Sequence, residues 1–206
     1  KKNPQSKNMT NQEPVDYIAY REVTELNNFG STIIGIVHTN SMIYAVTKKK
    51  DLICYPRSVF RGNAPNSERK FPDISSTPIQ KFDVLSTNNL FHLLLLTNGQ
   101  LMISTETPRG LQQFHPAQFD NAPSQIINFV TVSNHQLLVV FSPQYIYIYI
   151  YDGETFTTKD CIENPKKKII DVLGSLTHFL IYDKNSYSIY DIDLQLIRED
   201  ALPKNF

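Results

Sequence analysis

Hydrophobic and polar residues along this chain follow the pattern of short β-strands separated by turns. Apolar segments of about four to eight residues, rich in Ile, Val, Leu, Tyr and Phe, are bounded by Asn, Asp, Gly, Pro and Ser, as is typical of β proteins. Helical periodicity is nearly absent. The pattern therefore predicts an all-β fold.

Four segments of similar pattern repeat along the chain. They begin at Ile33, Ile79, Ile126 and Ile169, so that successive starts are separated by 46, 47 and 43 residues. Each unit is predicted to hold three strands and a weaker fourth one. Four short strands in about 40–50 residues is the spacing of a β-propeller blade. We predict a β-propeller of four-stranded blades, about four of them in this chain. A β-sandwich or barrel with accidental self-similarity is the alternative.

Two short turns agree with this arrangement. Thr97–Gln100 reads "TNGQ" between two apolar runs, and Tyr151–Thr155 reads "YDGET". Asn-Gly and Asp-Gly are strong hairpin signals, because both positions tolerate a left-handed backbone. We expect a hairpin at each turn.

The segment Tyr145–Tyr151, "YIYIYIY", is apolar or aromatic at every position. A strand buried on both faces has such a run, whereas a half-buried strand alternates. We predict that it is the third strand of the third blade, with its isoleucines against one neighbouring blade and its tyrosines against the other. If this chain did not supply both neighbours, another chain would have to cover the strand.

The domain organisation is predicted from the same pattern. Residues 1–14 are a polar N-terminal tail, and residues 15–206 form the propeller domain or a partial propeller. Val15–Val23, "VDYIAYREV", is a candidate strand for closing the ring. Seven blades need roughly 300 residues at the spacing of such repeats. We favour an incomplete or interrupted larger propeller over a four-bladed one.

Histidines recur near the start of the second strand in three units: His92 in "LFHLLLLTNGQL", His135 in "SNHQLLVVF" and His178 in "GSLTHFLIYD". The order of His, apolar run, turn, Gly and apolar residue resembles the repeat of the RCC1 family, which consists of seven-bladed propellers. "STETPRGL", Ser104–Leu111, is similar to the Gly-Leu ending of those repeats. The first unit departs from the pattern, and most of the family's paired glycines are missing. WD-like, kelch and citron-homology propellers remain alternatives, although this chain has no Trp.

Composition narrows the functional classes. The 206 residues are 41% hydrophobic and 19% charged, with a formal net charge of zero, which argues against a dedicated nucleic-acid-binding protein. Cys54 and Cys161 form neither a metal-binding spacing nor a disulfide framework, so we expect an intracellular protein of the cytoplasm or nucleus. No apolar run approaches the length of a membrane-spanning helix, and we expect no membrane insertion.

No catalytic motif is found in the sequence. Phosphate-binding, dinucleotide-binding, zinc-protease and serine-hydrolase signatures are absent, and the recurring histidines are interpreted as structural residues at strand starts. We therefore predict a non-enzymatic protein with no catalytic residues, no metal site and no cofactor.

Basic residues suggest one binding surface. In a propeller, the connections between second and third strands and between successive blades emerge on one face. The cations assigned to such connections would give this face a positive potential that docks an acidic protein surface or a phosphate backbone. Solvated turn lysines are the alternative interpretation. The predicted basic face consists of Lys48, Lys49, Lys50, Arg61, Arg69, Lys70, Lys166, Lys167, Lys168 and Lys184.

The sequence thus predicts an interaction scaffold, a propeller subunit of a multi-protein assembly whose partners are other protein subunits. The alternative is an RCC1-like regulator that binds a small GTPase or chromatin through one face, while a nucleic-acid partner is less favoured. Two long proline-containing links, residues 60–78 and 107–124, are candidate binding loops, because long links on a rigid scaffold often carry function.

Overall fold

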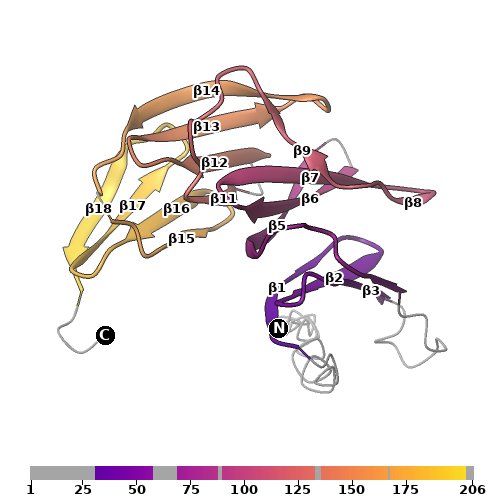
Figure 1. The fold of residues 1–206 in the computed structure, drawn as a ribbon. Coiled ribbons are helices and arrows are strands. Elements are labelled where there is room, and N and C mark those ends of the chain that lie inside the picture. Colours follow the sequence, from indigo (N-terminus) through magenta and orange to yellow (C-terminus); the bar gives the residue numbers. More distant parts are fainter. Residues whose placement is uncertain (1–30, 58–68, 88–89, 133–135, 167, 203–206) are drawn as a thin grey trace, which may run out of the picture.

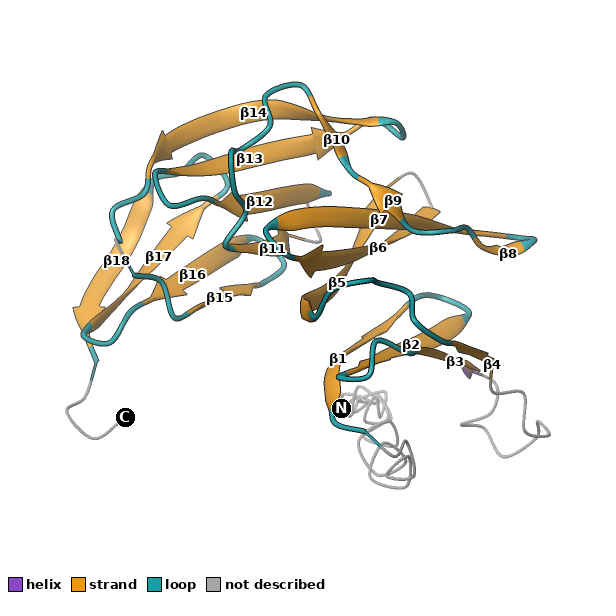
Figure 2. Cartoon of the chain, viewed as in Figure 1, coloured by secondary structure: helices purple, strands orange, loops and turns teal. Residues whose placement is uncertain are grey.

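The computed structural model of the protein describes residues 31–57, 69–87, 90–132, 136–166 and 168–202. Strands joined by turns and links fill this part of the chain (Figure 2). They form four sheets, in each of which the main strands are antiparallel and follow sequence order. The predicted all-β propeller of four-stranded blades is confirmed. The candidate closing strand Val15–Val23 and the tail of residues 1–14 lie outside the described residues.

Blades 1 and 4 have four strands each. Blade 1 consists of β1 (Ile33–His38), β2 (Met42–Thr47), β3 (Leu52–Pro56) and β4 (Arg69–Phe71). Blade 4 consists of β15 (Asp171–Gly174), β16 (His178–Tyr182), β17 (Ser186–Asp191) and β18 (Leu196–Ala201).

Blades 2 and 3 carry additional short strands at their outer edges. Blade 2 consists of β5 (Ile79–Thr87), β6 (Leu90–Thr97) and β7 (Gln100–Thr107), and β7 pairs with both β8 (Gly110–Leu111) and β9 (His115–Pro116). Blade 3 consists of β11 (Asn128–Val132), β12 (Leu137–Phe141), β13 (Tyr145–Tyr151) and β14 (Thr155–Glu163), with β10 (Gln118–Phe119) parallel to β14.

The blades follow one another along an arc (Figure 1), with blades 1 and 4 at its two ends. Neighbouring blades approach most closely through their first strands, in the order β1, β5, β11 and β15. Three apolar clusters fill the spaces between successive blades. The core is therefore divided into layers between sheets, as expected when each sheet buries both faces.

Strand β13 lies between two such layers. Ile146 and Ile148 are buried against Val172 and Phe179 of blade 4. Tyr147, Tyr149 and Tyr151 are buried in the cluster shared with blade 2. The predicted division of isoleucines and tyrosines between two neighbours is thus confirmed, and both neighbours belong to this chain. Ile150, at 47% exposed, departs from the pattern.

Both predicted hairpins are present. Asn98 and Gly99 have φ values of 49° and 73° between β6 and β7, the left-handed pair that a type I′ turn requires. Gly153 has φ 111° between β13 and β14. The Asp152 carboxylate there accepts hydrogen bonds from the backbone N–H groups of Glu154 and Thr155, both at 2.8 Å.

The link of residues 107–124 is more ordered than a loop, since it contains β8, β9 and β10. Strand β10 pairs with β14, the outer strand of blade 3, and so attaches the link to that blade. The Asp120 carboxylate accepts hydrogen bonds from the Thr158 backbone N–H at 3.0 Å and hydroxyl at 2.7 Å, and the Phe119 ring stacks on Phe156 with centroids 5.1 Å apart. The chain between blades 2 and 3 is thereby held against the sheet edge.

Candidate functional site: a groove between the first two blades

Most of the predicted basic residues lie in the connections assigned to them. Lys48–Lys50 lie in the β2–β3 turn, Lys184 in the β16–β17 turn, and Lys166 and Lys168 between β14 and β15. Arg69 and Lys70 do not lie in an inter-blade connection, and that placement was wrong. They belong to β4, where they pair with Cys54 and Ile53 of β3. The sequence pattern did not mark this strand because its residues are exposed. Arg61 and Lys167 lie outside the described residues.

The side chain of Lys166 is buried against blade 4. Its side chain is 4% exposed, and its ammonium donates to the Ser186 hydroxyl at 2.7 Å. It also lies 3.4 Å from an Asp183 carboxylate oxygen and 3.6 Å from a Glu199 one. A buried lysine held by these partners fastens the link between blades 3 and 4, so it is poorly placed to meet a partner.

Two other lysines form ion pairs within blade 1 and its link to blade 2. The Lys70 ammonium lies 2.9 Å from the Asp51 carboxylate, and that of Lys50 lies 3.6 Å from Asp73. Within the described part of the chain, the exposed cations of the predicted set without an ion pair are Lys48, Lys49, Arg69, Lys168 and Lys184. The basic face is thus reduced to separate patches on blades 1 and 4.

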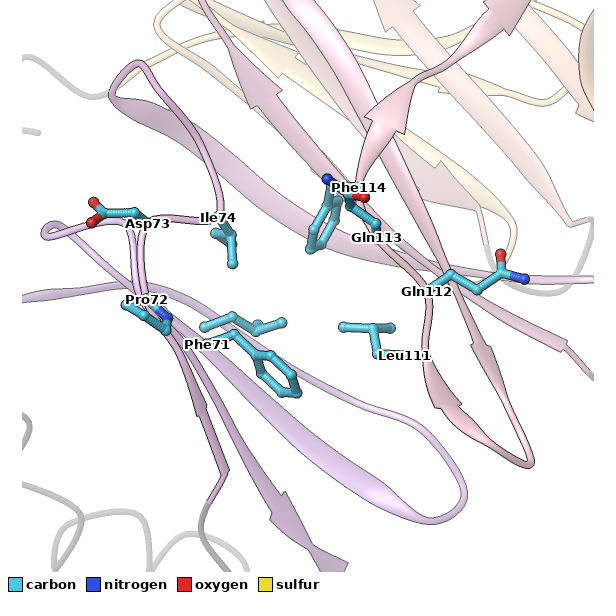
Figure 3. A pocket seen from close by; sticks show the side chains of 9 residues that line it. Phe71, Pro72, Asp73, Ile74, Leu111, Gln112, Gln113 and Phe114 are labelled. Carbon is cyan, nitrogen blue, oxygen red and sulfur yellow. The ribbon is translucent and has the colours of Figure 1, made fainter.

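A groove lies between the outer edges of blades 1 and 2 (Figure 3), and its volume is about 440 Å³. One side comes from the end of β4 and the link that follows it, and the other from β8 and the segment before β9. Both sides belong to the two long links that the sequence singles out. The groove is lined by Leu52, Phe71, Pro72, Asp73, Ile74, Leu111, Gln112, Gln113 and Phe114.

Backbone hydrogen bonds hold the first side of the groove. Phe71 pairs with Leu52 in the β3–β4 ladder. The N–H of Ile74 then donates to the carbonyl of Lys50 at 2.9 Å, and this bond ties the link to the β2–β3 turn. Lys50 therefore lies next to one end of the groove. Lys49 and Lys48 continue the same turn toward β1, where the Lys48 N–H donates to the Thr32 carbonyl at 2.7 Å.

The second side is fixed to the outer strand of blade 2. Leu111 pairs with Glu106 across the β7–β8 ladder. The Gln112 N–H donates to the Thr105 carbonyl at 3.0 Å, and the Ser104 hydroxyl donates to the Gln112 carbonyl at 2.6 Å. Leu111 and Phe114 also pack on the apolar cluster between blades 1 and 2. Both sides are thus preformed rather than assembled on binding.

The groove combines apolar side chains with a few polar ones, and it has one positive end. Phe71, Ile74, Leu111 and Phe114 point into it from both sides (Figure 3). Near that end, Lys48, Lys49 and Lys50 of the β2–β3 turn and Lys70 of β4 are opposed by Asp51 and Asp73, so positive charge is in excess there. Such a surface suits an apolar ligand with an acidic end.

The buried reactive residues His92 and Cys54 have structural roles. His92 is buried, with one ring nitrogen 2.7 Å from the Thr87 hydroxyl and the other 2.9 Å from that of Thr105, and burial lowers its pKa to about 4. Burial also raises the pKa of the Cys54 thiol to about 12, which makes it a poor nucleophile. No group of three or more His, Cys, Asp or Glu in the described part of the chain could hold a metal ion.

A polar cluster between first strands was missed by the sequence analysis. The Lys81 ammonium of blade 2 donates to the Val172 carbonyl at 2.9 Å and lies 3.5 Å from the Asp171 carboxylate of blade 4. Asn128 of blade 3 donates to the same carboxylate at 3.1 Å. The signal for it was a polar residue near the start of the first strand in blades 2, 3 and 4. These contacts join three blades, so we interpret their role as structural.

Blade 4 carries a second apolar surface, on the side turned away from blade 3. Its hollow of about 390 Å³ is lined by Leu173, Leu180, Ile189 and Ile197, among others. No charged turn lies among the residues that line it. Its lining therefore says less about the chemistry of a ligand than the lining of the groove does.

Comparisons with known proteins bear on the fold. No protein-family model and no curated protein matches the chain.

A search for membrane-spanning helices among the described residues found none of sufficient length and hydrophobicity.

Solved structures resemble the chain, and 363 chains of known structure match it. One is the crystal structure of BBS1N in complex with ARL6DN, soaked with mercury. It aligns with a TM-score of 0.54 and 11% sequence identity, over 82% of this chain and 53% of that chain. The chain thus spans about half of that structure's length. At this identity the likeness concerns the fold alone, and the fold that the two share is a β-propeller.

Proposed function

We propose that this protein is a non-enzymatic interaction scaffold, an intracellular propeller subunit of a multi-protein assembly. The observation that carries the proposal is the groove between blades 1 and 2, which two long links build from apolar side chains on a hydrogen-bonded framework. A preformed apolar groove recruits a partner with little loss of conformational entropy on the scaffold's side.

Capture of partners with the purified chain from native lysate tests the proposal. The informative variant is Phe71→Gln, because Phe71 is 40% exposed and lines the groove. Its matched control is Leu176→Gln, which alters an apolar residue 61% exposed in the β15–β16 turn of blade 4. Stoichiometric partners retained by the wild type support a scaffold. Catalytic turnover of a small molecule without any partner would contradict it.

A regulator that binds a small GTPase or chromatin is the second candidate. It is favoured by the sequence resemblance to RCC1 repeats and by the solved complex of a similar propeller, BBS1N, with ARL6DN. Retention of a panel of small GTPases loaded with GDP or with a GTP analogue separates the two candidates. Binding that depends on the nucleotide supports the regulator, whereas stable partners indifferent to nucleotide support the scaffold.

A further inference from the structure

We infer that the groove between blades 1 and 2 binds an extended peptide of a partner protein, with apolar side chains in the groove and acidic residues beside Lys48 and Lys49. The inference rests on the proposed scaffold function and specifies its partner chemistry.

Two four-residue segments, residues 71–74 and 111–114, line the groove, and this arrangement favours an elongated ligand. It lies between the outer edges of two sheets, where β4 and β8 are the outermost strands. Phe71 and Leu111 lie on opposite sides, with Ile74 and Phe114 further along (Figure 3). A volume of about 440 Å³ is within the range of ligand-binding cavities. A peptide can place a few apolar side chains there while its backbone continues past both ends.

The polar groups of the groove suit a peptide backbone. Gln112 and Gln113 are exposed on the second side, and an amide side chain both donates and accepts hydrogen bonds. Asp73, the carboxylate that lines the groove, lies 3.6 Å from the Lys50 ammonium. The groove residues themselves thus leave no isolated charge to repel an uncharged backbone.

Charge sets the direction of the peptide. The bond between Ile74 N–H and Lys50 carbonyl places the β2–β3 turn at one end of the groove. Lys48 and Lys49 are exposed there and make no ion pair within the described part of the chain. An acidic flank next to them gains favourable electrostatics, and a basic flank is repelled. A nucleic acid would be attracted by the same lysines but would leave the aliphatic part of the groove unfilled.

Three pools of fluorescein-labelled synthetic dodecapeptides test the inference on the purified chain. All carry the same central apolar pair, Leu-x-Phe, whose two side chains lie on one face of an extended backbone. The pools differ in flanks of Asp and Glu, Asn and Gln, or Lys and Arg. Fluorescence anisotropy is measured at about 50 mM and about 300 mM salt. The acidic pool should bind about three- to tenfold more tightly than the neutral pool at low salt, and the difference should shrink at high salt.

Paired variants assign the binding to the groove. Lys48→Glu combined with Lys49→Glu should abolish the acidic preference, whereas Lys184→Glu, in the equivalent turn of blade 4, should preserve it. Phe71→Gln should weaken all pools by about tenfold, as expected for the loss of a partly buried aromatic contact, and Leu176→Gln should weaken none. Unchanged thermal unfolding of each variant shows that these surface substitutions leave the fold intact.

Several results would overturn the inference. These are equal affinity for the three pools, no binding of any pool, or equal losses in the variants and their controls. A single-stranded oligonucleotide that binds more tightly than the acidic pool, sensitive to Lys48→Glu but not to Phe71→Gln, would assign the turn to a nucleic acid. Partners captured from lysate equally by wild type and Phe71→Gln would leave the scaffold function standing and remove the groove from it.

Discussion

Blades 3 and 4 meet at Gly174, and this contact supports a sharp prediction. Gly174 is the last residue of β15, and a Cβ atom added there would lie 2.3 Å from the carbonyl oxygen of Thr131 and 3.2 Å from the Cβ of Val130. Its backbone conformation is open to other residues, because its φ lies outside the left-handed region. The substitution Gly174→Ala is therefore opposed by the close approach of β11 alone.

The size of the effect follows from the distance. A carbon and a carbonyl oxygen in contact are about 3.3–3.6 Å apart, so β15 would have to move away from β11 by about 1 Å. That movement separates Val172 and Phe179 from Val130 and Val132 in the buried cluster between the blades. Overpacking of this kind costs about 1–3 kcal/mol, and the lower entropy of the unfolded chain returns about 0.4–1 kcal/mol. We expect Gly174→Ala to lower the free energy of unfolding by about 1–2 kcal/mol.

Urea denaturation followed by tyrosine fluorescence measures the change, since the chain has 11 Tyr and no Trp. With a slope of about 2 kcal/mol per molar urea, the midpoint should fall by about 0.5–1 M. The matched control is Gly35→Ala in the first strand of blade 1, where the added Cβ would lie 3.1 Å from the Cβ of Phe82 and 3.3 Å from its carbonyl oxygen. A shift of a few tenths of an ångström relieves that contact, so the expected loss is below about 1 kcal/mol.

The losses in free energy of unfolding of the two variants are then compared. A Gly174→Ala midpoint equal to that of the wild type would refute the close packing of β15 on β11. A larger loss in Gly35→Ala than in Gly174→Ala would refute the use of the contact distance to rank the two blade interfaces.

Three further predictions concern the side chains of Lys166, Tyr149 and His92. Lys166→Met should lower the free energy of unfolding by about 1–2 kcal/mol, below the loss for a fully buried pair because its partners Asp183 and Glu199 are partly exposed and can be hydrated. Lys168→Met, at an exposed position, should change it by less than about 0.5 kcal/mol in the same urea titration. Tyr149→Phe should lower it by about 1 kcal/mol in thermal unfolding, since the hydroxyl donates to the Asn121 carbonyl at 2.6 Å; an unchanged midpoint would argue against that bond. Burial holds the pKa of His92 near 4 in the folded chain, below about 6.5 in the unfolded chain. The stability that neutral His92 contributes is therefore complete above about pH 6.5 and is lost as pH falls toward 4, by about 1–3 kcal/mol in all. His92→Gln should flatten this part of the pH dependence, and parallel curves for the two proteins would contradict the assignment.

Regular, buried parts of the fold were predictable from the sequence. The start of each blade, the Asn98–Gly99 turn and the two faces of Tyr145–Tyr151 each left a local signal of period, turn chemistry or continuous apolarity. Outer strands left a weaker signal. All three residues of β4 are exposed, so no burial pattern marks them, and Arg69 and Lys70 were assigned to a connection instead.

The candidate site was predictable only in part. The two long links stood out by length and proline content, and both contribute to the groove. Their meeting could not be read from the sequence, because Phe71 and Leu111 come from different blades. Lys166 lies in the predicted connection, but its side chain is buried rather than exposed on the basic face. Its contacts with Ser186 and Asp183 bury it, and these contacts cannot be read from the sequence.

The sequence by itself determined the repeat, the strands within each repeat and the two-sided burial of the central strands. These properties arise from neighbours along the chain and from the solvent, which act at the scale of one blade. The tertiary structure alone decided which blade covers which face, how closely Gly174 approaches β11, and which cations remain in solvent. These depend on contacts between residues far apart in the sequence, and each contact forms only once the sheets have stacked.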